Sequence, residues 1–227
     1  MKENACKIVL LGESGVGKTC IINRFVNNQF DESGISTIVA TFTEKIMTFE
    51  KLNGKSINFQ IWDTAGQEKY RSLNKIFYEK TEAAILVYDI TNKQSFEEVQ
   101  NYWYKQLKEQ APENISKKLL NFKFYFFLLV IGLAGNKSDL FDREEVGEEE
   151  AKNFATKIGA FFKLTSACTS FGIEELFESI GSQILTSKFK DDENNINNAG
   201  NNEANNAGVK LEAQKAKNDK QKKKNCC

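Results

Sequence analysis

The sequence predicts a three-layer α/β protein, in which helices cover both faces of a mostly parallel six-stranded sheet. Short apolar runs recur at residues 7–12, 57–63, 83–90, 130–136 and 160–166. Segments with helical patterning separate them, as at residues 95–110 and 147–159. Parallel strands are buried on both faces and form continuous apolar runs, and their alternation with helices favours a covered α/β sheet.

One strand of this sheet is predicted to be antiparallel. Residues 41–63 contain two strand-like runs on either side of Asn53 and Gly54. Asn-Gly favours a hairpin turn, because both residues accept a positive φ. The first strand of this hairpin brings the expected number to six.

Composition divides the chain into a folded domain, residues 1–187, and a tail, residues 188–227. Eight of the 13 residues at 194–206 are asparagine, and little in that segment could be buried. We therefore expect the tail to be disordered. Residues 215–227 hold six lysines against one aspartate and end in Cys226 and Cys227, an arrangement typical of membrane anchors.

Charge and cysteine usage narrow the function classes. Lys and Arg number 31 and so do Asp and Glu, which leaves no electrostatic reason to expect nucleic-acid binding. The five cysteines are odd in number and lack the spacing of a disulfide framework, and the sequence starts without an apolar signal region, so we expect a reduced intracellular protein. Because the chain has no histidine and Cys6, Cys20 and Cys168 are far apart, we expect no zinc site. The longest apolar run, residues 124–134, is shorter than the ~20 residues that span a bilayer.

A phosphate-binding loop is predicted at residues 12–19, "GESGVGKT", between a strand and a helix. Its glycines let successive backbone N–H groups turn towards phosphate oxygens. Lys18 would bring a charge to the β and γ phosphates, and the Thr19 hydroxyl could bind Mg²⁺. Kinases, ATPases and GTPases share this loop, so other residues must identify the base.

Guanine specificity is predicted by "NKSD", residues 136–139, at the end of an apolar run. The Asp139 carboxylate could accept hydrogen bonds from N1–H and the amino group of guanine, which adenine does not offer. "TSA", residues 165–167, also ends a predicted strand and could present a backbone N–H to the guanine oxygen. Ligands of open α/β sheets bind at this edge.

A third motif, "WDTAGQE" at residues 62–68, contains groups suited to phosphate chemistry. Asp63 ends a strand and could belong to the Mg²⁺ shell. The Gly66 N–H could meet the γ-phosphate, and the Gln67 amide could orient a water molecule.

With these motifs in this order, the sequence resembles the Ras superfamily of small GTPases over about residues 7–185, and within it the Rab family. "YRSL" and "ILVYDIT" are similar to Rab segments, and the switch and helix segments are similar to those of early-endosomal Rabs. The resemblance implies a P-loop G domain that binds GTP, GDP and Mg²⁺. The implied nucleotide contacts are Gly12, Ser14, Gly15, Val16, Gly17, Lys18, Thr19, Cys20, Phe30, Thr37, Asp63, Gly66, Asn136, Lys137, Asp139, Ser166 and Ala167.

The same resemblance implies Thr19, Thr37 and Asp63 as metal ligands and Gln67 as the catalytic residue. It equates Phe42, Trp62 and Phe77 with an effector-contact triad, for which core packing is the competing interpretation. Hydrolysis is expected to be slow without an activating protein. The expected partners are exchange factors, activating proteins, a GDP-dissociation inhibitor and effectors, all binding a monomer.

The terminal cysteines resemble a double geranylgeranylation site. Two lipid chains would form a stable anchor where one would not. The expected location is the cytoplasmic face of endomembranes, with early endosomes favoured and cycling through the cytosol.

Three departures from the family pattern concern Val39, Cys168 and residues 116–129. Val39 replaces a glycine in the first switch, and Cys168 replaces a lysine after Ser-Ala. Residues 116–129 are surplus to the usual spacing and are rich in residues that AT-rich codons encode. A retained intron is favoured over a genuine insertion.

Two other functions are open. A nucleotide-dependent docking module with impaired hydrolysis or switching could result from Val39 or the insertion, although Thr37 and Gln67 argue against it. A P-loop nucleoside or adenylate-type kinase should bind adenine and have an arginine-rich lid. "NKSD" and the lack of such a lid in the sequence argue against it.

Overall fold

The computed structural model describes residues 4–31, 37, 41–64, 75–110 and 129–188. The chain divides into two units, residues 1–185 and 186–227, and the strands found in the described ranges all belong to the first. The boundary expected at residue 187 and the disorder expected beyond it stay predictions. Val39 and residues 116–128 lie outside the described residues.

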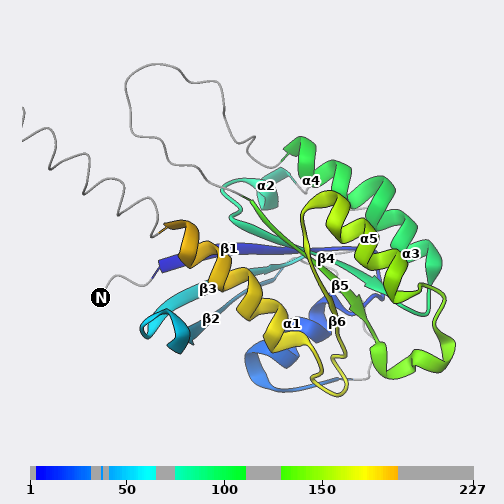
Figure 1. Cartoon of the computed structure of the whole chain (residues 1–227), viewed down its shortest axis with the longest axis horizontal. Helices are drawn as coiled ribbons and strands as arrows, with labels where there is room; N and C mark the ends of the chain where they lie inside the picture. Colours follow the sequence, from blue (N-terminus) through cyan, green and yellow to red (C-terminus); the bar gives the residue numbers. More distant parts are fainter. Residues whose placement is uncertain (1–3, 32–36, 38–40, 65–74, 111–128, 189–227) are drawn as a thin grey trace, which may run out of the picture. The chain divides into compact units, whose positions relative to one another are not determined.

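The first unit contains a six-stranded sheet with the order β2-β3-β1-β4-β5-β6 (Figure 1). Its strands are β1 (Asn4–Leu11), β2 (Thr41–Phe49), β3 (Lys55–Asp63), β4 (Ala83–Asp89), β5 (Val130–Asn136) and β6 (Phe161–Leu164). All neighbouring pairs are parallel except β2 and β3, which are antiparallel. The predicted fold class is confirmed.

The β2–β3 hairpin differs in detail from the predicted tight turn. Phe49 pairs with Lys55, so residues 50–54 form the loop, and η1 (Glu50–Leu52) fills its first part. Asn53 and Gly54 have φ of 59° and 68° and reverse the chain, as their sequence suggested. A single 3-10 turn thus precedes the left-handed pair, which the Asn-Gly signal alone does not reveal.

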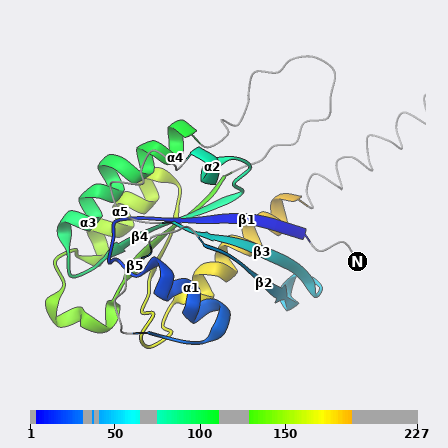
Figure 2. The same cartoon turned by 180° about the vertical axis from the view of Figure 1, so that it is seen from behind.

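Helices cover both faces of the sheet, as Figures 1 and 2 show. On one face lie α1 (Lys18–Asn27) and a helix at residues 173–188. The other face carries α2 (Lys75–Tyr78), α3 (Lys93–Glu98), η3 (Val99–Trp103), α4 (Tyr104–Gln110) and α5 (Glu148–Ile158). None of the helices in these ranges is long and apolar enough to cross a membrane.

The helix predicted at residues 95–110 is interrupted. It begins two residues earlier, at Lys93, because the Asn92 side chain accepts a hydrogen bond from the Ser95 N–H at 3.1 Å and caps the first turn. Residues Val99–Trp103 then form a π-helical turn, a feature that often occurs near functional sites. The turn brings buried Trp103 to the phosphate loop, where its indole N–H donates to Glu13 Oε1 at 3.2 Å.

Aromatic packing attaches the helices to each face. On the first face, Phe25 of α1 stacks on Phe177 with ring centroids 3.7 Å apart, and both rings meet Phe59 of β3 edge-on. Burial of each such ring contributes roughly 1.5–3 kcal/mol. On the opposite face, the ring centroids of Tyr88 in β4 and Phe96 in α3 lie 4.8 Å apart, within a continuous buried cluster. Aromatic side chains therefore pack against both faces of the sheet.

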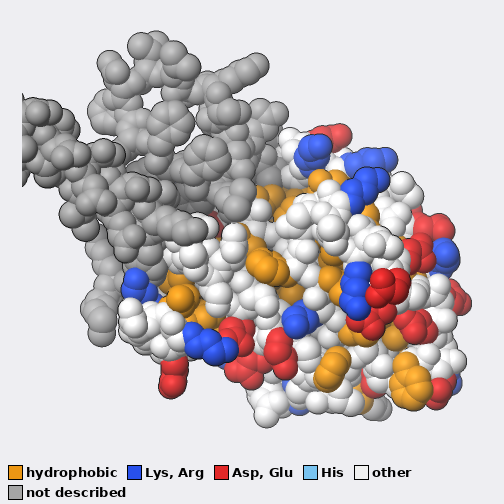
Figure 3. All heavy atoms as spheres, viewed as in Figure 1, with side chains coloured by type: hydrophobic (Ala, Val, Ile, Leu, Met, Phe, Trp, Pro, Cys, Tyr) orange, Lys and Arg blue, Asp and Glu red, His pale blue; other side chains and the backbone are white. Residues whose placement is uncertain are grey.

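The exposed side of α5 carries mixed charge. Lys152 pairs with Glu148 at 2.9 Å and with Glu149 at 3.3 Å, while Lys93 lies 3.7 Å from Glu150. Figure 3 shows basic and acidic side chains interspersed over the described part of this face. Exposed pairs of this kind contribute little to stability.

The strand register sets the position of the candidate site. Leu10 of β1 lies beside Asp63 of β3, and Asp89 of β4 lies beside Asn136 of β5. Parallel strands end at a common edge, where ligands of open α/β sheets bind. The predicted motifs at residues 12–19, 62–68 and 136–139 therefore start from the same edge.

Candidate active site

The phosphate loop connects β1 to α1, and its glycines are required by geometry. Gly17 has a φ of 93°, and a Cβ there would lie 2.4 Å from Asn136 Nδ2. A Cβ at Gly12 would lie 2.2 Å from the Val87 main-chain oxygen. No side chain caps the first turn of α1, and no acidic residue lies in that turn. The N–H groups there are suited to an anion.

Lys18 points back into this loop. Its Nζ donates to the main-chain oxygens of Gly12 and Glu13, each at 2.8 Å, and the residue is only 5% exposed. Burial lowers the pKa of Lys18 to about 8, although Asp63 and Glu13 act in the opposite direction. A phosphate in the loop would offset this desolvation and favour the charged ammonium.

Three oxygen-bearing side chains meet beside the loop. Thr19 Oγ1 donates to Asp63 Oδ2 at 2.6 Å, and Thr37 Oγ1 lies 2.5 Å from Thr19 Oγ1 and 3.4 Å from the same carboxylate oxygen. Burial raises the pKa of Asp63, and the hydrogen bonds from the two threonines partly oppose that rise. The Thr64 hydroxyl donates to the Leu10 main-chain oxygen at 2.6 Å and fixes the end of β3.

This cluster fits a magnesium ion. Asp63 Oδ1 is buried and has no hydrogen-bond partner among the described residues. One carboxylate and two hydroxyls are hard oxygen ligands of the kind that Mg²⁺ accepts, usually alongside phosphate oxygens and water. Elsewhere in the described ranges, no three His, Cys, Asp or Glu side chains come together in a way that could hold a metal.

The predicted base-reading residues are joined to the phosphate loop. Asn136 is 1% exposed, and its Nδ2 donates to the Val16 main-chain oxygen at 2.8 Å. Its Oδ1 accepts from the Thr165 hydroxyl at 3.3 Å. Ser166 Oγ donates to Asp139 Oδ1 at 2.5 Å, which connects the "TSA" segment with the "NKSD" segment.

Lys137 adopts the left-handed conformation, with a φ of 65°, and its Nζ lies 2.5 Å from Asp89 Oδ2. Asp89 was not predicted from the sequence, although its position near the end of the apolar run 83–90 could have indicated it. Two further residues were not predicted either: Arg24, which donates to the main-chain oxygens of Ala167 and Cys168, and Glu13, which contacts Lys18 and Trp103. The sequence carries no distinguishing pattern for these two residues.

Other predicted residues lie around this centre. Ser14 and Gly15 are exposed at the mouth of the loop, Val16 is buried, and Phe30 is half-buried just after α1. Burial raises the pKa of half-buried Cys20. The predicted residues that lie outside the described part of the chain are Gly66, Gln67, Cys226 and Cys227.

The aromatic triad is continuous. The ring of Trp62 lies 5.3 Å from that of Phe42 and 5.9 Å from that of Phe77. Trp62 and Phe77 also pack against the buried cluster, while Phe42 is 50% exposed. The three rings therefore extend from the core to the surface, so core packing accounts for two of them and leaves Phe42 presented outward.

Comparison with known proteins agrees with this arrangement. The chain matches a model of the Ras family over residues 7–186. It is 42% identical over 178 residues to the Ras-related protein RGP2 of Oryza sativa subsp. japonica, covering 78% of this chain and 74% of that protein. It is 43% identical to human Ras-related protein Rab-31 over 178 residues, or 78% and 82% of the two chains. Human Ras-related protein Rab-8B is 39% identical over 194 residues, or 86% and 84%.

Proposed function

This chain belongs to the Ras family and, within it, to the Rab small GTPases, and from that premise we propose that the site at the carboxyl edge of its sheet binds GTP and GDP with Mg²⁺. One observation carries the proposal. The hydrogen bond from Asn136 to Val16 joins the phosphate loop to the segment that would distinguish guanine. A general P-loop fold does not require that link.

The phosphates would bind along the loop and the first turn of α1. Backbone N–H groups from Gly12 to Thr19 would cradle the oxygens, and Lys18 would exchange its two carbonyl partners for the β and γ phosphates. Thr19, Thr37 and Asp63 would hold Mg²⁺, which would neutralise developing phosphate charge. Thr37 would thereby sense the γ-phosphate.

The base would lie between the Asn136 and Ser166 segments. Asp139 would accept from N1–H and the amino group of guanine, and Ser166 keeps that carboxylate in place. The Ala167 N–H would donate to the guanine oxygen. Phe30 would pack on the ring, and Lys137 would complete the pocket from the position set by Asp89.

Hydrolysis would depend on Gln67, which would orient the attacking water. Of the arginines in the described ranges, Arg24 donates to the main-chain oxygens of Ala167 and Cys168, and Arg143 ends η4 (Ser138–Arg143), so neither is held at the phosphate loop. Without such a cation, turnover in Ras is about 10⁻⁴ s⁻¹. We therefore expect slow intrinsic turnover and an activating protein that supplies an arginine in trans.

GTP and Mg²⁺ would order two switch segments, the first containing Thr37 and the second beginning at Gly66 and Gln67. Effectors would bind the ordered face at Phe42, Trp62 and Phe77. An exchange factor and a GDP-dissociation inhibitor would complete the cycle of a monomeric switch in membrane trafficking. Cys226 and Cys227 would carry the lipid that holds the chain on the cytoplasmic face of endomembranes. Early endosomes are the favoured compartment, and similarity to Rab-31 is compatible with that choice.

The nucleotide that accompanies the purified full chain tests this function. The chain would be isolated with Mg²⁺, denatured, and its released nucleotide separated by chromatography. About one guanine nucleotide per chain is expected, from the site stoichiometry of a P-loop protein. Bound adenine nucleotide would favour the kinase alternative, and a soluble chain without nucleotide would overturn the proposal.

A further inference from the structure

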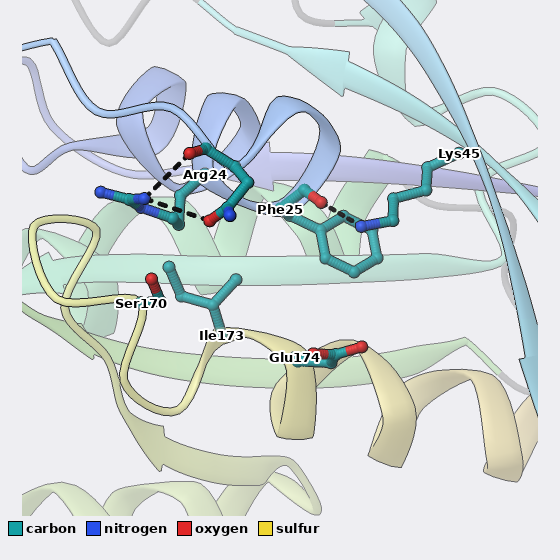
Figure 4. Close-up of a pocket in the computed structure, with 7 residues that line it drawn as sticks. Arg24, Phe25, Lys45, Ser170, Ile173 and Glu174 are labelled. Carbon is teal, nitrogen blue, oxygen red and sulfur yellow. Dashed lines mark hydrogen bonds between the residues drawn. The ribbon is translucent and has the colours of Figure 1, made fainter.

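A small cavity of about 200 Å³ lies between α1, β2 and the beginning of the helix at residues 173–188. It is lined by Arg24, Phe25, Asn28, Lys45, Ser170, Ile173 and Glu174. Figure 4 shows Arg24 and Phe25 on one side of it, opposite Ser170, Ile173 and Glu174. Its two cationic side chains have different partners, which is the basis of the inference.

Lys45 is bound to α1 itself. Its Nζ donates to the Phe25 main-chain oxygen and lies 4.2 Å from the centre of the Phe25 ring. Neither contact involves the segment that would read the base. Lys45 therefore stabilises the end of α1 against β2.

Arg24, in contrast, connects α1 to residues 165–172, which follow β6 and which we call the base segment. Its Nε donates to the Ala167 main-chain oxygen at 2.8 Å, and its Nη2 donates to the Cys168 main-chain oxygen at 2.9 Å. Its Nη1 donates to Asn28 at the end of α1, at 3.0 Å to the main-chain oxygen and 3.2 Å to Oδ1. One half-buried guanidinium thus binds two consecutive carbonyls and a helix end.

The base segment turns sharply between its two attachments. Ser166 N donates to the Phe171 main-chain oxygen at 2.9 Å, and Thr169 N donates to Ser166 Oγ at 3.1 Å. Ser170 and Gly172 have φ of 73° and 70°. On one side, Ser166 ties this turn to Asp139, and on the other side Arg24 ties it to α1.

We infer that Arg24 is a positioning residue of the nucleotide site, and that its grip on the Ala167 and Cys168 carbonyls holds the Ala167 N–H towards the 6-oxo group of guanine. The inference rests on the proposed function. The planar guanidinium suits this task because its donors have fixed directions, whereas an ammonium is a point charge. Hydrogen bonds from a charged donor are stronger than neutral ones.

The test compares binding of GDP with binding of 6-thio-GDP, in the full chain with excess Mg²⁺. 6-Thio-GDP keeps N1–H and the amino group but replaces the 6-oxo group with sulfur, a weak acceptor. Arg24→Ala should weaken GDP binding by about 2- to 10-fold, the size expected for loss of the one neutral hydrogen bond from the Ala167 N–H, and should leave 6-thio-GDP binding nearly unchanged. Arg24→Lys should behave similarly, because a lysine cannot bind both carbonyls in the same geometry.

Lys45→Met is the matched control, since Lys45 lines the same cavity without contacting the base segment. It should preserve the ratio between the two affinities. If Arg24→Ala and Arg24→Lys leave the ratio of the GDP and 6-thio-GDP affinities as in the wild type, whether or not both affinities fall, Arg24 has only a structural role and the inference is wrong. A wild-type chain that binds neither nucleotide would overturn the proposed function itself, which distinguishes the two failures.

Discussion

The side-chain amide of Asn136 donates to the main-chain oxygen of Val16 at 2.8 Å, across 120 positions of sequence. The bond joins the carboxyl end of β5 to the phosphate loop, and Gly17 leaves the space that Asn136 occupies. One buried side chain therefore joins the proposed phosphate site to the proposed base site.

Replacing this side chain should loosen the bound nucleotide. Asn136→Ala leaves the Val16 oxygen without its donor in a buried position, a loss of about 1–3 kcal/mol. If this loss falls on the nucleotide-bound state, we expect nucleotide dissociation to become about 5- to 150-fold faster, since 1.4 kcal/mol corresponds to about one factor of ten. Release of fluorescent GDP measures the rate, and Asn153→Ala on the exposed face of α5 is the control. Unchanged release would show that the link does not affect the nucleotide.

Asp63 should connect nucleotide retention to magnesium. In the wild type, removal of Mg²⁺ with EDTA should accelerate GDP release. In Asp63→Asn, release should already be fast with Mg²⁺ present and should respond little to EDTA, because an amide is a poorer ligand than a carboxylate. Release rates with and without EDTA decide the matter. A variant as sensitive to EDTA as the wild type would contradict the ligand role of Asp63.

Gln67→Leu should separate binding from hydrolysis. Leucine cannot orient a water molecule, so GTP affinity should stay unchanged while hydrolysis stimulated by an activating protein is lost, a stimulation of about 10⁵-fold in Ras. Phosphate release in single-turnover conditions measures this. Normal stimulated hydrolysis would refute the role of Gln67.

The buried hydroxyl of Tyr88 should make the folded protein less stable as the solution becomes alkaline. Burial raises the pKa of Tyr88 above its ordinary value of 10.0, and the hydroxyl has no hydrogen-bond partner among the described residues. The folded state therefore retains the proton that the unfolded chain releases, and stability falls as pH rises above about 10.

Tyr88→Phe should have a Tm at pH 8 equal to or above that of the wild type, and a shallower fall between pH 9 and pH 11, the range about its ordinary pKa. Burial also raises the pKa of Tyr78, so the variant should still lose some stability as the pH rises. Thermal unfolding across this range measures the slope, with half-buried Tyr104→Phe as the control. Parallel curves for wild type and Tyr88→Phe would contradict the prediction.

Residues 116–129 are proposed to derive from a retained intron. Of these, Leu129 is described, and it packs against the buried cluster just before β5. In a chain without residues 116–129, Ile115 precedes Val130 and supplies an apolar side chain at that position. We expect the mature transcript to lack these codons and the shortened chain to bind GDP as tightly as the full one. A transcript that contains them, or a shortened chain that binds no GDP, would refute the proposal.

Much of the fold was predictable because its signals are local. Buried parallel strands must be apolar throughout, so the runs around β1, β4 and β5 identified the sheet, and Asn53-Gly54 identified the antiparallel hairpin. The π-helical turn at Val99–Trp103 was not predictable, since no glycine or proline in that segment marks the change of hydrogen-bond pattern.

The sequence by itself determined the sheet, the phosphate loop and the segments that would read the base, because each depends on residue type at short spacing. Tertiary structure alone decided how these parts are held together. The bonds of Asn136 to Val16 and of Arg24 to Ala167 and Cys168 join residues more than 100 positions apart. Strand order and register decide which residues meet in this way. The acceptors are main-chain carbonyls, which every residue has, so the sequence carries no local sign of these partners.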